Sequence, residues 1–228
     1  MPSAKSSNDA PESLRRTRRR RTLLIGVLAL LGGASALFVG CGAVITPPAN
    51  VHDPVRVYIA DYGRHSSLVL PTPEGEAVEY AYGEWNWFAL NKDGWWRTPG
   101  VVLIPSRGAL GRSTWPVFVD ASDAQRHMRV VTVIEVSVDR ERAAALERRL
   151  RERFDAHADT ARNNPRYGLE FVHDDDSYWL FNHCNTAVAA WLRELGCEVR
   201  GATLLADFRL RAPEPEGAAP GDHTLGTE

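Results

Sequence analysis

The sequence predicts an α+β protein in which an N-terminal transmembrane or signal helix precedes an antiparallel sheet with packed helices. Three observations predict this class. Residues 22–45 form one uncharged apolar run. Short stretches rich in β-branched and aromatic residues follow it, separated by clusters of turn-forming residues. Two later segments, after Asp139 and around Cys184, place apolar residues at helical spacing.

Composition excludes several classes of protein. The chain has 228 residues, 44% of them hydrophobic, and seven tryptophans, so it can bury a core. Disorder, collagen, a coiled coil and a multi-span membrane protein are therefore excluded. Three cysteines are too few for a disulfide framework.

Charge divides the chain in two. Lys and Arg number 27 against 29 Asp and Glu, and residues 1–21 hold seven of the basic and two of the acidic side chains. The remainder therefore carries 20 basic and 27 acidic residues, a net charge of −7. An acidic globular part predicts no nucleic-acid partner.

The N-terminal region predicts export. Residues 1–21 are expected to be a disordered basic segment in the cytoplasm. Residues 22–45 are long enough to span a bilayer core of about 30 Å. Arginines before the span keep the N-terminus inside, which places the rest of the chain beyond a bacterial inner membrane, facing the periplasm or the cell exterior.

Three forms of this segment remain open: an uncleaved anchor, a lipoprotein signal and a cleaved signal that releases a soluble domain. The stretch from Phe38 to Cys41 resembles the lipobox of bacterial lipoproteins, in which the cysteine is lipidated. It departs from that motif at Phe38, where Leu is usual. A buried helix of a cytosolic core is disfavoured by the arginines and by the length of the run.

An exported domain is expected over residues 50–211, after a short Pro-containing linker. A turn over 71–76 joins the second and third of its strands as a hairpin. The alternating segment 129–138 is the clearest strand pattern. Strands are predicted over 55–60, 66–70, 77–82, 100–105, 116–119 and 129–138.

Two helices are predicted in this domain. The first begins at an N-cap, Asp139, runs to about residue 157 and buries Leu146, Leu150 and Phe154. Residues 163–177 are expected to be a loop. The second helix covers 183–195 and ends before Gly196, a natural C′ residue. The Pro- and Gly-rich tail, 212–228, is expected to be disordered.

Cys184 is the candidate nucleophile. It lies at the start of the second helix, with Asn182 or His183 as the N-cap, where free N–H groups and the helix dipole favour a thiolate. Its spacing from Val188 places it on the inward face. A buried cysteine that only fills space is the structural alternative. Cys197 lies beyond the helix, too far away for a disulfide with Cys184.

A nucleophilic cysteine needs a base, and His65, just before an apolar strand, is the candidate. Cysteine on a helix tip and histidine on an adjacent strand is a papain-like geometry, circularly permuted here because the histidine comes first. Glu79 or Glu84 would orient the imidazole, and either could instead be a solvated charge. His65 could alternatively be a structural residue at the strand edge.

Other residues near the cysteine have competing interpretations. Asn182 and Asn185 could donate to an oxyanion, as could the backbone N–H of Cys184, although helix capping suits Asn182 better. His183 could compete as the base, but adjacent helical residues point about 100° apart.

Two further clusters favour structural roles. His173 with the aspartates 174–176 lacks the ligand spacing of known zinc or calcium loops, so a solvated acidic loop is preferred to a metal site. The tryptophans could line a groove, rest on the membrane or belong to the core, and the core is preferred. They are Trp85, Trp87, Trp95 and Trp96.

Three segments, residues 64–71, 79–84 and 181–196, resemble an uncharacterised bacterial family, domain of unknown function 2459. Its members share a histidine at a strand start, a Glu-aromatic-Gly-aromatic-Gly-Asp stretch and a Cys-Asn-Thr helix start. This chain departs from the family at Ala81, at Glu84 and at His183. The His-then-Cys order is also similar to permuted NlpC-type and lecithin:retinol-acyltransferase-like thiol enzymes, which cleave or transfer acyl groups.

Three functions are therefore expected, in descending order. The first is a membrane-anchored thiol hydrolase or acyltransferase acting on amide or ester bonds, without a cofactor, whose substrate is a peptidoglycan peptide or a lipid. The second is an inactive envelope module that binds a peptide or a lipid. The third is a metal-binding protein that uses His65, Cys184 and His183 or His173.

Overall fold

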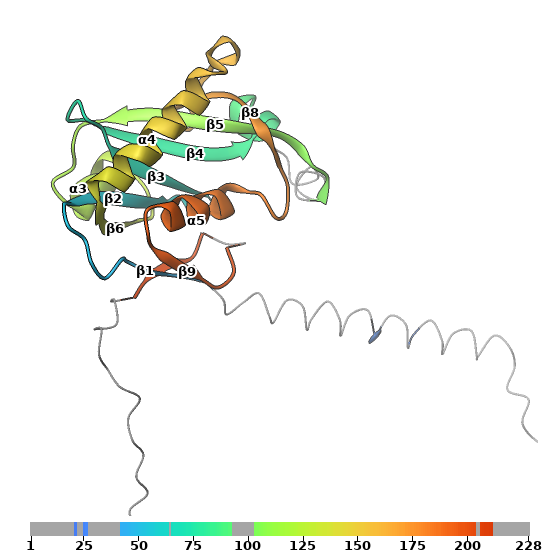
Figure 1. Ribbon diagram of the computed structural model, residues 1–228. Helices are drawn as coiled ribbons and strands as arrows, with labels where there is room; N and C mark the ends of the chain where they lie inside the picture. Colours follow the sequence, from blue (N-terminus) through green and yellow to red (C-terminus); the bar gives the residue numbers. More distant parts are fainter. Residues whose placement is uncertain are drawn as a thin grey trace, which may run out of the picture. The chain divides into compact units, whose positions relative to one another are not determined.

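A seven-stranded antiparallel sheet is the main element of the computed structural model, which describes residues 21, 25–26, 42–63, 65–92, 103–203 and 206–211. The strand order is β6-β2-β3-β4-β5-β8-β7 (Figure 1). Its strands are β2 (Pro54–Asp61), β3 (Ser66–Pro71), β4 (Ala77–Glu84), β5 (Ser106–Trp115), β6 (Thr132–Asp139), β7 (Arg162–Asn164) and β8 (Leu169–Tyr178).

A second, three-stranded sheet contains β1 (Ala43–Thr46), β9 (Glu198–Arg200) and β10 (Phe208–Leu210), with β1 in the middle. The helices are α3 (Ala121–Met128), α4 (Arg140–Asp155) and α5 (Cys184–Glu194), with the π-helical turn η1 (Trp85–Ala89) and the 3-10 turn η2 (Ala158–Thr160). The class is therefore α+β, as the sequence predicts.

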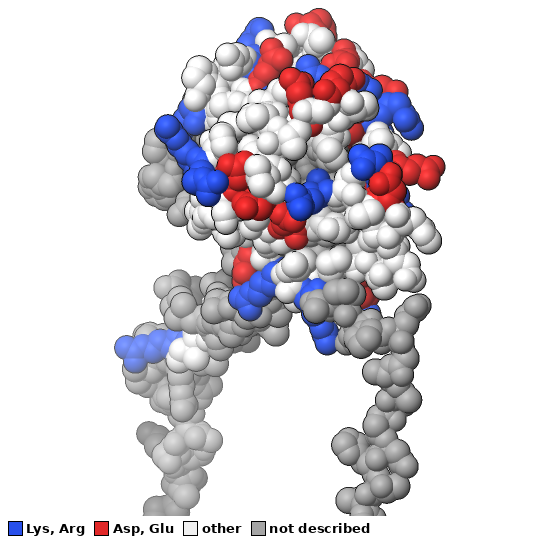
Figure 2. Space-filling view, turned by 90° about the vertical axis from the view of Figure 1, so that its left-hand side faces the viewer, with Lys and Arg blue, Asp and Glu red and all other residues white. Residues whose placement is uncertain are grey.

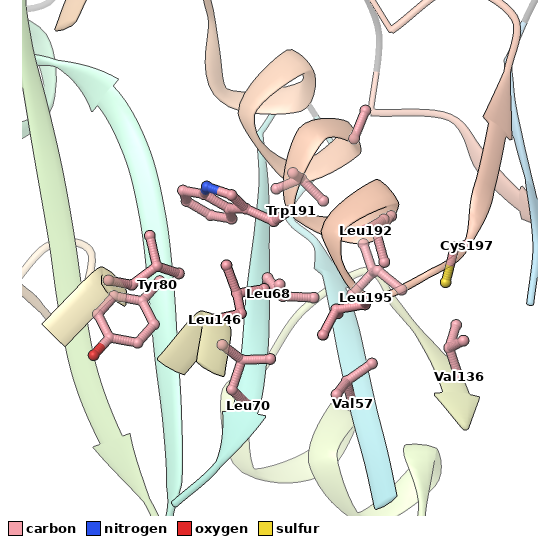
Figure 3. Close-up of a cluster of buried hydrophobic side chains, with 14 of the residues drawn as sticks. Val57, Leu68, Leu70, Tyr80, Val136, Leu146, Trp191, Leu192, Leu195 and Cys197 are labelled. Carbon is pink, nitrogen blue, oxygen red and sulfur yellow. The ribbon is translucent and has the colours of Figure 1, made fainter. Parts of the chain in front are cut away.

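Helices α4 and α5 pack on one face of the large sheet and form the main core. Leu68 of β3 and Tyr80 of β4 meet Leu146 of α4 and Trp191 of α5 there (Figure 3). Each of these side chains is at most 4% exposed. Leu146, Leu150 and Phe154 are all buried on this face, which confirms the predicted inward side of α4.

The opposite face of the sheet is also covered. Helix α3 packs against Tyr58, Ala60 and Val69, and η1 packs against Ala81 and neighbouring residues of β5 and β8. Strand β4 is consequently buried at all eight positions. Every side chain of this strand, polar or apolar, must therefore find its partners inside the protein.

The strand predictions succeeded where apolar runs were uninterrupted. The segments 55–60, 66–70 and 77–82 fall in β2, β3 and β4, and residues 132–138 of the predicted strand 129–138 fall in β6, whereas 129–131 precede it. The strand predicted over 116–119 is wrong, since that segment is a loop. Of the strand predicted over 100–105, residues 103–105 are not in a strand and precede β5, whereas 100–102 lie outside the described residues.

The loop predicted over 163–177 is wrong. Strand β8 covers most of it, including the acidic run, because Arg153 of α4 reaches across and forms ion pairs with Asp174 and Asp176. The Asp174 side chain is fully buried in this pairing. One guanidinium thus neutralises the charges that made the segment look like a solvated loop.

The predicted membrane span, 22–45, ends too late. Residues 43–45 belong to β1, whose Ala43 and Ile45 are fully buried, so the compact unit begins at Gly42 rather than at residue 50. Within the parts of the chain that the structure describes, no helix is both long enough and apolar enough to cross a membrane. Residues 27–41, the tail 212–228 and most of 1–21 lie outside the described residues.

The helix ends follow local chemistry. Asp139 is the N-cap of α4 as predicted, but its carboxylate accepts the backbone N–H of His52 at 2.9 Å. Helix α5 ends at Glu194 with Leu195 as its C-cap; Gly196 follows with φ +90°, and the N–H groups of Gly196 and Cys197 bond to carbonyls of the last turn. This is the expected glycine termination.

The Arg153–Asp174 pair gives a stability prediction. Replacing Arg153 by Met leaves the buried Asp174 carboxylate unpaired and should lower the free energy of unfolding by about 3 kcal/mol, measured by urea denaturation. Arg149→Met is the control, because its pair with Glu194 is about half exposed and should cost about 0.5 kcal/mol. Equal losses in the two variants would contradict the burial argument.

Candidate functional site

The topology brings most of the predicted site residues to one end of the large sheet. His65 precedes β3, Glu84 ends β4, Tyr178 ends β8, and Cys184 begins α5 (Figure 1). The antiparallel registers align these strand ends with one another. Strand ends that meet a helix N-terminus present free backbone donors, so this is a suitable place for polar chemistry.

The Cys184 sulfur is buried and hydrogen-bonded. Cys184 is 5% exposed. Its sulfur accepts the backbone N–H groups of Ser66 and Asn185 and the hydroxyl of Tyr178. These donors come from β3, α5 and β8, so three separate elements hold the sulfur in place.

Burial nevertheless determines the charge of this thiol. Desolvation raises the pKa of Cys184 to about 11 and outweighs the hydrogen bonds from these three donors and from its own backbone N–H, all of which lower it. The resting group is therefore a neutral thiol, whereas the helix N-terminus predicted a thiolate. Both Cys184 and Cys197 are free, and burial raises the pKa of Cys197 to about 11 as well.

The imidazole of His65 is not a partner of the sulfur. Its ring lies 4.8 Å from the Phe88 ring and 6.1 Å from the Tyr62 ring, on the face covered by η1. The backbone N–H of the next residue, Ser66, bonds to the sulfur. Leu68 and Leu70 pack in the core with α4 and α5, so alternation along β3 turns the Ser66 side chain to that face and the preceding residue away from it. The two members of the expected dyad therefore lie on opposite faces of the sheet.

Burial keeps His65 uncharged. Both ring nitrogens are buried without a hydrogen-bond partner. Desolvation lowers the pKa of this imidazole to about 4. At neutral pH the ring is therefore a free base.

Neither carboxylate candidate contacts His65. Glu79 is buried and accepts from Ser67 Oγ at 2.6 Å, from Tyr62 Oη at 2.7 Å and from Trp115 Nε1 at 3.0 Å. Burial raises its pKa, although all three donors oppose the shift. Tyr62 is the only link that these contacts make between Glu79 and the ring of His65.

Glu84 caps the π-helical turn η1 through its carboxylate. Its carboxylate accepts the backbone N–H of Trp87 at 2.7 Å and Asn86 Nδ2 at 3.1 Å, so it caps η1. Trp85 is buried in the core as preferred from the sequence, and Trp87 is partly buried. Trp95 and Trp96 lie outside the described residues, as does Cys41.

His183, not Asn182, is the N-cap of α5. The N–H of His183 donates to Thr186 Oγ1 at 2.7 Å. Burial lowers the pKa of His183, and its Nε2 has no partner. Asn182 instead donates to Tyr82 Oη at 3.2 Å and to the Ser177 carbonyl at 2.9 Å, which holds the turn before the helix.

Unpaired polar atoms mark this end of the sheet. In the described part of the chain, the buried side-chain N and O atoms without a hydrogen-bond partner belong to four residues: His65, Ser66, His183 and Asn185. Ser66 is a hydrogen-bond donor to the sulfur and His65 precedes it, whereas His183 and Asn185 flank Cys184. Each such atom costs about 1–3 kcal/mol, and native proteins keep few of them. Their concentration here indicates a site that stability alone does not explain.

Tyr178 is the contact that the sequence did not reveal. Its hydroxyl bonds to Cys184, and burial raises its pKa. The expected loop ended just before it, and a single tyrosine six residues before a cysteine is not a recognisable sequence motif. Only the pairing of β8 with β5 places it over the helix start.

The metal interpretation receives no support from the described residues. They contain no group of three or more His, Cys, Asp or Glu side chains that could hold a metal ion. His173 packs its ring against Trp85, with centroids 4.1 Å apart. Asp174 and Asp176 are engaged by Arg153.

Comparison with known proteins does not identify this site. No protein-family model, curated protein or solved structure matches the chain.

The raised pKa of Cys184 predicts slow alkylation. With a pKa of about 11, roughly one thiol in 10⁴ is ionised at pH 7, so its reaction with iodoacetamide should accelerate about tenfold per pH unit up to pH 10. Peptide mass spectrometry would follow Cys184 and Cys197 separately. Urea-unfolded protein is the control and should react faster at pH 7. A pH-independent rate at Cys184 below pH 7 would instead indicate a thiolate.

His65 predicts a loss of stability in acid. Its pKa falls from 6.5 to about 4 on folding. Between these values the unfolded chain binds a proton that the folded chain does not, so stability falls as pH falls through this window, by up to about 3 kcal/mol. His65→Phe should remove that component of the pH slope in urea titrations, whereas the exposed His52→Phe should not. Equal slopes in both variants would contradict the assignment.

Proposed function

We propose that this protein is a cysteine-dependent hydrolase or acyltransferase that acts on amide or ester bonds, with Cys184 as the nucleophile. The observation that carries the proposal is that three residues next to Cys184 or hydrogen-bonded to it, Ser66, His183 and Asn185, have buried side-chain polar atoms without a partner. Buried polar atoms without a partner lower the stability of the fold, so we expect a ligand or a reaction to use them. The sequence order of His65 and Cys184 and the resemblance to a family of unknown function also support it.

The reaction starts from neutral groups. An imidazole accepts the Cys184 proton as the sulfur attacks the acyl carbonyl, and returns it to the departing amine or alkoxide, which leaves a thioester. Water or an acceptor alcohol then attacks the thioester and regenerates the thiol. Backbone N–H groups at the α5 N-terminus, including that of Cys184, stabilise the oxyanion.

Two imidazoles compete for the role of base. His65 precedes the donor Ser66, but its ring packs on Phe88 at the other face of the sheet, so the chain at the start of β3 must rearrange before the ring can reach the sulfur. His183 precedes Cys184 and has an unpaired Nε2. Burial keeps both neutral and able to accept a proton. A papain-like arrangement corresponds to His65 as the base, with Glu79 as the group that orients it through Tyr62.

The proposed setting is the bacterial envelope. The apolar run after the basic segment would act as an anchor or a lipoprotein signal, with Cys41 as the lipidated residue in the second case. Because β1 starts at Ala43, an anchor over residues 22–41 would retain about 20 residues, still enough for a span.

An inactive binding module is the second candidate. The separation of His65 from the sulfur favours it, since a degenerate site would keep the fold and the pocket while losing the dyad. The two candidates differ in whether Cys184 forms a covalent intermediate.

The test compares two buried free cysteines. Full-length Cys184→Ala and Cys197→Ala would be assayed with 4-nitrophenyl esters and anilides, together with mass spectrometry of the acylated Cys184 peptide. We expect Cys184→Ala to abolish turnover and acylation, and Cys197→Ala to retain both. Thermal denaturation checks that each variant is folded. Turnover retained in Cys184→Ala would reject Cys184 as the nucleophile, and no acylation in the wild type would favour the binding module.

His65→Gln and His183→Gln would identify the base. Loss of a general base should lower kcat by about 10²-fold or more. If His65 is the base, the wild-type pH–rate profile should fall in acid around its pKa of about 4, and that limb should disappear in His65→Gln. Similar modest effects in both variants would mean that neither imidazole takes the proton.

A further inference from the structure

Four large apolar side chains are exposed at the end of the sheet that holds Cys184. We call them the apolar rim: Leu103, Ile104, Trp179 and Phe181 are 67%, 66%, 36% and 70% exposed. The rings of Trp179 and Phe181 meet edge to face, with centroids 4.9 Å apart. Large exposed apolar side chains gathered in one place mark binding surfaces more often than isolated ones do.

The rim is structurally tied to the sulfur. Ser106, at the start of β5, pairs with Tyr178, at the end of β8, so residues 103–104 and 179–181 leave the sheet at the same end (Figure 1). Trp179 and Asn182 exchange two backbone hydrogen bonds of 3.0 Å. The Tyr178 hydroxyl bonds to the sulfur. One short turn therefore carries both the aromatic pair and the cysteine.

The rim segments carry no charge. Residues 177–192 contain no Lys, Arg, Asp or Glu, and neither do residues 103–106, with Arg107 and Arg193 as the first cations beyond them. The opposite end of the sheet is different, because acidic and basic side chains are interspersed over it (Figure 2). A peptide with several carboxylates would find no cation along these two segments, whereas a hydrocarbon chain needs none.

We infer that the substrate of the proposed reaction is an ester or amide of a long, uncharged acyl chain. The chain lies on the apolar rim, and its carbonyl reaches the sulfur of Cys184, which is buried beside the unpaired polar atoms of Ser66, His183 and Asn185. This inference rests on the proposed function and selects lipid over peptide among its substrates. An apolar surface leading to a few convergent polar groups is the usual form of a small-molecule site. An anchor over residues 22–41 would also keep the domain at a membrane, where acyl lipids are concentrated.

Affinity labelling tests the rim without requiring turnover. Full-length protein in detergent micelles would be treated with N-dodecyl or N-methyl chloroacetamide, or with a chloroacetyl dipeptide that bears two carboxylates. In each case sulfur displaces chloride from the same warhead, and the thiol proton passes to the buffer. Peptide mass spectrometry measures the rate at Cys184, with Cys197 as an internal reference.

We expect the dodecyl reagent to label Cys184 at least tenfold faster than the methyl reagent, with no such preference at Cys197. Phe181→Ser and Ile104→Ser should each lower that ratio about fivefold or more. Val119→Ser is the matched control, since Val119 is 73% exposed in the loop beyond the other end of the sheet, and it should leave the ratio unchanged.

Two outcomes would overturn the inference: no chain preference at Cys184, or fastest labelling by the acidic dipeptide, which would assign a peptide substrate. Chain-dependent labelling without ester turnover would reject the enzyme and keep the hydrocarbon site. Turnover that depends on Cys184 without chain-dependent labelling would keep the enzyme and reject the lipid substrate.

Discussion

Side-chain alternation along β3 constrains everything around Cys184. Five of the six residues of this strand are buried, because helices cover one face of the sheet and α3 and η1 cover the other. Consecutive residues must therefore enter different interiors. The backbone N–H of Ser66 bonds to the sulfur. The residue before it, His65, faces Tyr62, and the residue after it, Ser67, bonds to Glu79. A shift of one residue in the strand register would exchange these sets.

Desolvation outweighs hydrogen bonding in the pKa values of Cys184, His65 and Glu79. The helix N-terminus and a tyrosine hydroxyl favour a thiolate at Cys184, yet burial raises its pKa to about 11. Burial also lowers the pKa of His65 to about 4 and raises that of Glu79 despite three donors. At neutral pH the Cys184 thiol and the His65 imidazole are thus both uncharged, which suits proton transfer during attack on a carbonyl. Unpaired polar atoms are the cost of this arrangement.

Sequence patterns were informative wherever local and tertiary preferences agreed. Strands β2, β3, β4 and β6 and both long helices were predicted because their apolar periodicity matches their burial. Strand β8 was missed because its aspartates look solvated unless Arg153, from a distant helix, is already in place. Strand β1 was absorbed into the apolar run before it, since an apolar strand and the end of a membrane span have the same composition.

In the candidate site, too, some features follow from local sequence and others only from the tertiary structure. Local sequence is sufficient to identify Cys184 as a helix-start thiol, Gly196 as a helix terminator and His65 as a residue at a strand start, because capping and periodicity depend on near neighbours. Partners that come from distant strands depend on register and on which face each side chain takes. Tertiary structure alone therefore placed Tyr178 and the Ser66 N–H on the sulfur, and turned the His65 ring toward Phe88. It also decided the protonation states, because burial is a property of the folded chain.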